Sequence, residues 1–191
     1  MPYLAVQKLL DPAMLKGMLH YWTADFLSDL PDTTVDTLLE LATQPVSPLT
    51  QVILIPGGGA ISRVAEDATA FGNRQTRWNI HSLSVWADPL DTDRNIAYIR
   101  HVTTAMKPWT TGRAYLNFLG DEGQQRIATA FGPDNYPRLQ TLKARYDPTN
   151  LLCNNQNIQP AVALPGGALR SADVISASSG LTSRPNGSTA L

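Results

Sequence analysis

The stretch from Arg77 to Trp86 reads RWNIHSLSVW and has the composition of a β-strand. Strand alternation places Asn79 and His81 on one face, with Trp78 and Ile80 on the other. A polar pair within an apolar, aromatic strand needs hydrogen-bond partners if it is buried. Asn79 and His81 are therefore candidate site residues. The alternative is that His81 is a satisfied core residue, which is the more common situation for a lone histidine.

Residues 113–119 read RAYLNFL and predict another strand. Alternation here would bring Tyr115 and Asn117 together on one face. The opposite, apolar face would belong to the core and consist of Ala114, Leu116 and Phe118. The face with Tyr115 and Asn117 is open to two interpretations, a functional site or a solvated surface.

The rest of the chain mixes helical and strand patterns. Helices are predicted, each ended by proline or glycine, at 21–30, 34–44, 91–107, 122–131 and 136–146. The apolar run 52–55 is typical of a strand covered on both faces, and a second strand is predicted around 60–64. Because the elements do not alternate as β-α-β units, we expect an α+β fold with helices over a mainly antiparallel sheet.

Composition excludes several classes of function. The 191 residues include 16 acidic and 15 basic side chains, which gives a net charge of −1. This charge provides no positive field for nucleic acid or for an anionic membrane surface. There is no apolar run of about 18 residues that predicts a membrane span. The first residues lack the basic and apolar regions of a secretory signal, and the compartment stays undetermined.

The candidate metal ligands and glycines do not form known motifs. The three histidines are far apart in sequence, and the single cysteine, Cys153, cannot form an internal disulfide or a multi-cysteine zinc site, so no metal is predicted. The run Gly57-Gly58-Gly59 lacks the spacing of a phosphate-binding loop and predicts a tight connection with positive φ. Residues 161–191 have no aromatic side chain and are rich in small and polar residues, which predicts a disordered tail.

One set of motifs is specific. It comprises Tyr115-Leu116-Asn117 and three longer segments, FGPDNYPRL at 131–139, LKARYDPTNLL at 142–152 and NNQNI at 154–158. Together they resemble the C-terminal berberine-bridge-enzyme-like segment of FAD-linked oxidases in the vanillyl-alcohol oxidase superfamily. Upstream, Gly58-Gly59-Ala60, Thr69-Ala70-Phe71 with Arg74, and Trp86 followed by Asp88-Pro89 are similar to the substrate domain of that family. Two local departures are Leu152, where the family usually has Phe, and Cys153, where it often has Arg.

The resemblance covers residues 2–160 and implies the following organisation. Residues 1–110 correspond to part of the substrate-binding domain of a two-domain flavin oxidase, and residues 111–160 to its C-terminal segment. We expect the main FAD-binding domain to be absent from this chain, since the family carries it in a longer N-terminal region. The chain would then meet FAD mostly through a separate flavin-binding domain.

The resemblance also implies roles for individual residues. Tyr115 matches the tyrosine that sits over the flavin ring and helps to deprotonate the substrate hydroxyl, and Asn117 matches an asparagine that hydrogen-bonds near the flavin. His81 matches a position where the family has Glu, Gln or Asp, which makes it a candidate base with Tyr115. Asn79, two residues earlier on the same face, would line the substrate site with His81.

Two hypotheses follow. The first is the substrate side of an FAD-dependent oxidoreductase that oxidises an alcohol, sugar or specialised metabolite. Hydride would pass to the flavin, with O₂ as the acceptor. The alternative is a catalytically silent fragment or interaction module that lacks its flavin-binding domain. The exposed apolar face left by that domain would then serve to bind a partner chain.

Overall fold

The computed structural model describes residues 1–8, 11, 15–163 and 169–170. Most of the predicted disordered tail lies outside these residues. Within that tail, the short strands β4 (Val162–Ala163) and β5 (Leu169–Arg170) pair antiparallel. No helix in the part of the chain that the structure describes is long and apolar enough to cross a membrane.

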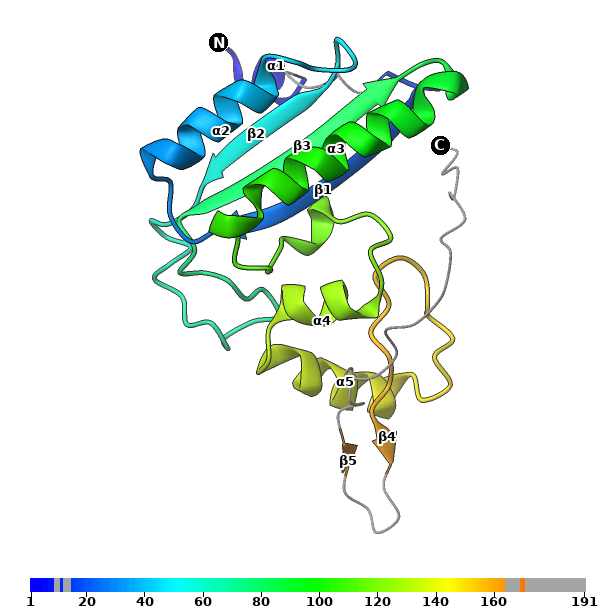
Figure 1. Cartoon of the computed structure of the whole chain (residues 1–191). Helices are drawn as coiled ribbons and strands as arrows, with labels where there is room; N and C mark the ends of the chain where they lie inside the picture. The colour runs from blue at the N-terminus through cyan, green and yellow to red at the C-terminus, as the bar shows by residue number, and fades with distance from the viewer. Residues whose placement is uncertain (9–10, 12–14, 164–168, 171–191) are drawn as a thin grey trace.

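A three-stranded antiparallel sheet forms the upper half of the molecule (Figure 1). Its central strand is β3 (Trp78–Trp86), which pairs with β1 (Leu19–Leu27) on one side and β2 (Gln51–Pro56) on the other. The prediction of a strand at 77–86 and of an antiparallel sheet is confirmed. The central position of β3 explains its composition, since a strand paired on both edges is buried along most of its length.

Three sequence predictions about strands and helices in this region were wrong. Residues 21–30 are not a helix, because β1 pairs along its whole length with β3, a partner too distant in sequence to be seen in a local pattern. The strand at 52–55 is an edge strand with half-buried side chains rather than one covered on both faces. Residues 60–64 form turns, since the chain leaves the sheet after Pro56.

Two helices cover one face of the sheet (Figure 1), namely α2 (Asp32–Ala42) and α3 (Thr92–Met106). The buried apolar side chains of α2 and α3 face the strands, and both helices were predicted from the sequence. The core between the two layers consists of Leu27, Leu38, Leu41, Ile80, Val102 and Met106. Burial of such aliphatic side chains contributes about 1.5–3 kcal/mol each, so this layer provides the main stabilisation of the sheet.

Below the sheet lie two antiparallel helices, α4 (Gln124–Phe131) and α5 (Asn135–Tyr146), close to the predicted bounds (Figure 1). The short helix α1 (Tyr3–Gln7) is exposed, and 3₁₀ turns occupy Pro89–Asp91 (η2), Lys107–Trp109 (η3) and Leu116–Phe118 (η4). The prediction of a strand at 113–119 was therefore wrong. After Ala114 the backbone turns beneath the sheet instead of pairing with it.

Candidate functional site

A cavity of about 420 Å³ lies on the side of the sheet opposite to α2 and α3. Since Trp78 and Ile80 face the helices, alternation places Asn79 and His81 on the cavity side. The lining comes from the three strands, from the loop between β2 and β3, and from η4. Its residues are Phe26, Ile55, Pro56, Gly57, Ile61, Phe71, Asn73, Arg74, Thr76, Asn79, Tyr115 and Phe118. The volume falls within the range of small-molecule sites, about 300–1,000 Å³.

Asn79 supplies a polar group to this mostly apolar lining. Its side chain is buried, and its Nδ2 donates to the backbone oxygen of Asp25 at 3.2 Å. That bond fixes the amide orientation and leaves Oδ1 buried with no hydrogen-bond partner among the described residues. A buried acceptor without a donor is costly in a closed core, so a ligand hydroxyl or amine suits this position.

Tyr115 lines the cavity from the opposite side, just before η4. Its hydroxyl oxygen accepts a hydrogen bond of 2.7 Å from Nδ2 of Asn117, and its ring meets the edge of Phe118 at a centroid distance of 5.0 Å. The predicted pairing of Tyr115 with Asn117 thus exists. It arises from the η4 turn rather than from strand alternation, and the side chain of Asn117 is exposed outside the cavity lining.

His81 lies behind Phe118 rather than in the cavity lining. The two rings stack at 4.3 Å with an interplanar angle of 6°, so Phe118 separates the imidazole from the space in front of it. Its Nε2 is buried and has no hydrogen-bond partner in the described part of the chain. Burial lowers the pKa of His81 below the usual 6.5, which keeps the imidazole neutral at pH 7.

The loop between β2 and β3 forms one wall of the cavity, which the sequence patterns did not predict. Glu66 accepts the backbone N–H groups of Asn73 and Gln75, at 2.7 and 3.1 Å. Asn73 in turn donates to the oxygen of Ala130 and accepts from Nη1 of Arg113. These bonds hold Phe71 and Arg74 against the cavity. Arg74 belongs to the sequence motif that resembles the family's substrate domain, but no local pattern could predict that this loop residue lines the cavity.

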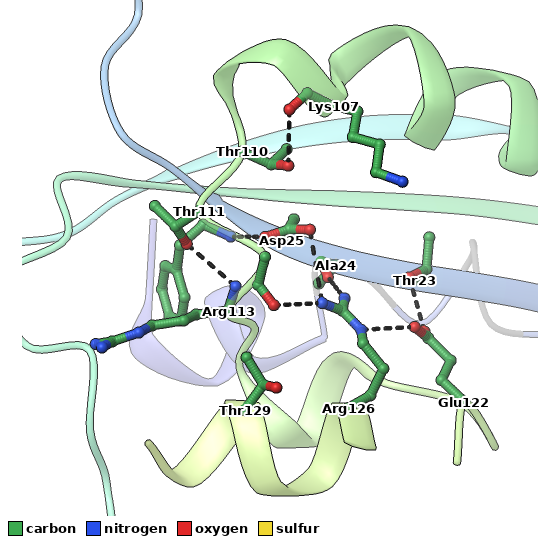
Figure 2. Close-up of polar contacts among 12 residues, drawn as sticks. Thr23, Ala24, Asp25, Lys107, Thr110, Thr111, Arg113, Glu122, Arg126 and Thr129 are labelled. Atoms are coloured by element: carbon green, nitrogen blue, oxygen red, sulfur yellow. Dashed lines mark hydrogen bonds and ion pairs between the residues drawn. The ribbon is translucent and has the colours of Figure 1, made fainter. Parts of the chain in front are cut away.

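A polar cluster joins the sheet to α4 (Figure 2). Arg126 donates to the backbone oxygens of Ala24 and Gly112, both at 2.7 Å, and to Glu122 at 3.0 Å. Its guanidinium also lies 3.6 Å from the carboxylate of Asp25. Burial raises the pKa of Asp25 to about 6 despite the opposing charge of Arg126. The cluster fixes the position of the 113–131 region, and hence of Tyr115, relative to β1.

The motif at 143–152 has a structural role. The carboxylate of Asp147 binds Nζ of Lys143 and accepts the backbone N–H groups of Leu151 and Leu152. Lys143 also donates to the oxygen of Leu152. The hydrogen bond from Lys143 holds the pKa of Asp147 below its usual value. Among the described residues, no group of three or more His, Cys, Asp or Glu side chains could hold a metal ion.

Comparisons with known proteins identify relatives of this chain. Residues 114–159 match the family model "Berberine and berberine like". The chain is 33% identical over 140 residues to the uncharacterised FAD-linked oxidoreductase YvdP of Bacillus subtilis strain 168. This match covers 73% of this chain and 30% of YvdP. It is also 28% identical over 126 residues to tetrahydroberberine oxidase of Berberis wilsoniae. This match covers 58% of this chain and 24% of that protein.

Solved structures share the fold. The structure of BBE-like #28 from Arabidopsis thaliana superposes with a TM-score of 0.69 at 23% identity, over 77% of this chain and 35% of that one. The matched part of the present chain thus spans between 24% and 35% of the length of these relatives. Over residues 114–159 the chain belongs to the berberine and berberine-like family, and it is related in sequence and fold to a part of FAD-linked oxidoreductases.

Proposed function

We propose that this chain forms the substrate side of an FAD-dependent oxidoreductase that oxidises an alcohol to a carbonyl compound, with O₂ as the final acceptor. The observation that carries the proposal is the cavity that Tyr115 and Asn79 line together. Tyr115 brings a phenol group and Asn79 an amide oxygen that has no partner among the described residues, and most of the other lining side chains are apolar. This is the combination that binds an alcohol and removes its proton while water is kept out.

The residues of this chain fit the ring end of FAD and not its phosphates. Tyr115 and the exposed Asn117 lie beside the flat ring of Phe118, and such a surface suits the edge and face of a flavin. The glycine run at 57–59 leads into a turn and not into a helix, so it does not supply a pyrophosphate site. When bound, FAD would supply the hydride acceptor, and Tyr115 and Asn117 would contact its ring system.

The protein's share of the reaction is orientation and proton transfer. The substrate hydroxyl donates to Oη of Tyr115, and its proton passes to Oη while the phenol proton of Tyr115 passes on to water, as the C–H hydride leaves the carbinol carbon. The substrate loses two electrons and becomes a carbonyl compound. Asn117 fixes the direction of Oη through its 2.7 Å hydrogen bond. His81, neutral at pH 7, holds Phe118 in position by stacking.

A chimera tests the proposal. Residues 1–163 of this chain replace the matched segment of YvdP, and the purified protein is incubated without O₂ with a panel of primary and secondary alcohols and sugars. We expect the visible flavin absorbance to disappear with at least one alcohol, and H₂O₂ to form when O₂ is readmitted. A chimera that holds FAD but is reduced by no member of the panel would support the silent interaction module instead.

A further inference from the structure

Arg74 is a buried cation whose charge nothing in the described structure neutralises. The residue is 9% exposed, and its Nη2 donates to Oγ1 of Thr69 at 2.6 Å. The guanidinium carbon lies 5.0 Å from the centroid of the Phe71 ring. Its Nε is buried without a hydrogen-bond acceptor, and none of the ion pairs among the described residues includes Arg74.

Neither carboxylate of the same loop, Glu66 or Asp67, forms an ion pair with Arg74. Glu66 is occupied by the backbone N–H groups of Asn73 and Gln75. The neighbouring Arg113 adds a second guanidinium, which donates to Oδ1 of Asn73. An arginine cannot give up its proton to avoid the cost of burial, so a buried guanidinium of this kind calls for an anionic partner. Because Arg74 lines the cavity, that partner can come from the cavity.

The other features of the lining restrict the ligand further. Four aromatic rings surround the space, from Phe26, Phe71, Tyr115 and Phe118. Flat aromatic ligands pack well against such rings in offset or edge contacts. Asn79 contributes Oδ1, a buried acceptor that has no donor among the described residues. The lining therefore combines a cation, an acceptor and an aromatic surface.

We infer that the cavity binds an aromatic alcohol that carries a carboxylate, with the carboxylate on Arg74 and the hydroxyl within reach of Asn79 and Tyr115. The inference rests on the proposed function, whose substrate class it narrows. Arg74 is then a specificity-determining residue. It selects the acid over a neutral molecule of the same shape, because a guanidinium forms charge-assisted and bidentate hydrogen bonds with a carboxylate.

Binding to the full 191-residue chain tests the inference without flavin or turnover. The probes are 4-(hydroxymethyl)benzoate and the neutral 4-(hydroxymethyl)benzamide, and the dissociation constants are measured by NMR titration. We expect the carboxylate to bind about 10-fold more tightly than the amide at pH 7. A third probe, 4-methylbenzoate, lacks the hydroxyl group and should bind more weakly than 4-(hydroxymethyl)benzoate. Equal affinity for the acid and the amide, or no binding of either, would overturn the inference.

Matched variants test whether the preference for the acid depends on Arg74. Arg74→Gln should abolish the preference for the acid, while Arg74→Lys, which keeps the charge but not the planar fork, should retain part of it. Arg77→Gln removes the same charge from an exposed side chain of the same loop and outside the cavity lining, so it should leave the preference unchanged. A loss in Arg77→Gln as large as in Arg74→Gln would assign the preference to general electrostatics and contradict a site at Arg74.

The outcome for this inference is separable from that for the proposed function. Tyr115→Phe should keep the preference for the acid, because the preference depends on Arg74. If the chain binds the acid selectively but no alcohol reduces the flavin of the chimera, the proposed oxidation is overturned and the role of Arg74 stands. A chimera that oxidises neutral alcohols but binds the acid no better than the amide would overturn only the role of Arg74.

Discussion

The guanidinium of Arg126 on α4 lies 3.6 Å from the carboxylate of Asp25 on β1, although the two residues are far apart in sequence. Through this pair and two backbone carbonyls, one side chain connects the berberine-like region to the edge of the sheet (Figure 2). Tyr115 lies between these anchors in the chain. The integrity of the cavity thus depends on a polar contact outside its lining.

Loss of Arg126 should strongly destabilise the fold. Arg126→Met keeps the length of the side chain, but it removes the charge beside the carboxylate of Asp25 and the donor to the backbone oxygens of Ala24 and Gly112. We expect the free energy of unfolding to fall by about 3 kcal/mol, as is usual when one partner of a buried ion pair is removed. Urea unfolding followed by circular dichroism measures the change. A loss below about 0.5 kcal/mol, the size typical of an exposed surface pair, would show that the cluster does not hold the two parts together.

Asp25 should make stability depend on pH. Its pKa of about 6 in the folded protein exceeds the ordinary value of 3.8, so the folded state binds the proton more tightly. The contribution is therefore favourable below about pH 4 and is lost as the pH rises through 6. Asp25→Asn should remove this slope between about pH 4 and pH 6. Urea midpoints at pH 4.5 and 7.5 test this, and an unchanged slope in the variant would refute the assignment.

His81 should make stability depend on pH in the opposite direction. Burial lowers its pKa below 6.5, so the unfolded chain binds the proton more readily, and stability contributed by the neutral form is lost as the pH falls through and below 6.5. A ¹H–¹³C NMR titration of the imidazole should give an inflection below pH 6.5. An inflection at or above 6.5 would mean that the ring is not enclosed behind Phe118.

Gly57 should tolerate no side chain. A Cβ at this position would collide with the backbone oxygen of Thr76, where the two ends of the cavity loop approach each other. Gly57→Ala should cost about 2 kcal/mol and weaken ligand binding in the cavity. Gly59→Ala is the control, because its Cβ would meet no atom within 4 Å and only its φ of +56° opposes it. If both variants lose the same stability in urea, the close contact at Gly57 is not the cause.

The sequence predicted the features that depend on local pattern. The helices α3, α4 and α5 and the strand β3 have strong periodicity or composition and clear ends, and their bounds are close to those expected. The face of β3 that carries Asn79 and His81 also followed from alternation alone. These features are set within about ten residues of chain, which a pattern can capture.

Features that depend on distant partners were not predictable. Residues 21–30 looked helical because Phe26 and Leu27 are both buried, on opposite faces of β1, and this removes the alternation that marks a strand. The contact between Tyr115 and Asn117 was expected for the wrong reason, since a turn and not a strand produces it. Arg74 reaches the cavity through the tertiary contacts of its loop, which leave no periodic signal.

The central claim is that Tyr115 takes the substrate proton during flavin reduction. The direct measurement compares the YvdP chimera that carries this chain with its Tyr115→Phe variant, in anaerobic stopped-flow reduction by an alcohol that reduces the parent. We predict equal FAD content and a rate at least about 100-fold lower in the variant, as expected for loss of a general base. Equal rates in the two proteins would contradict the account.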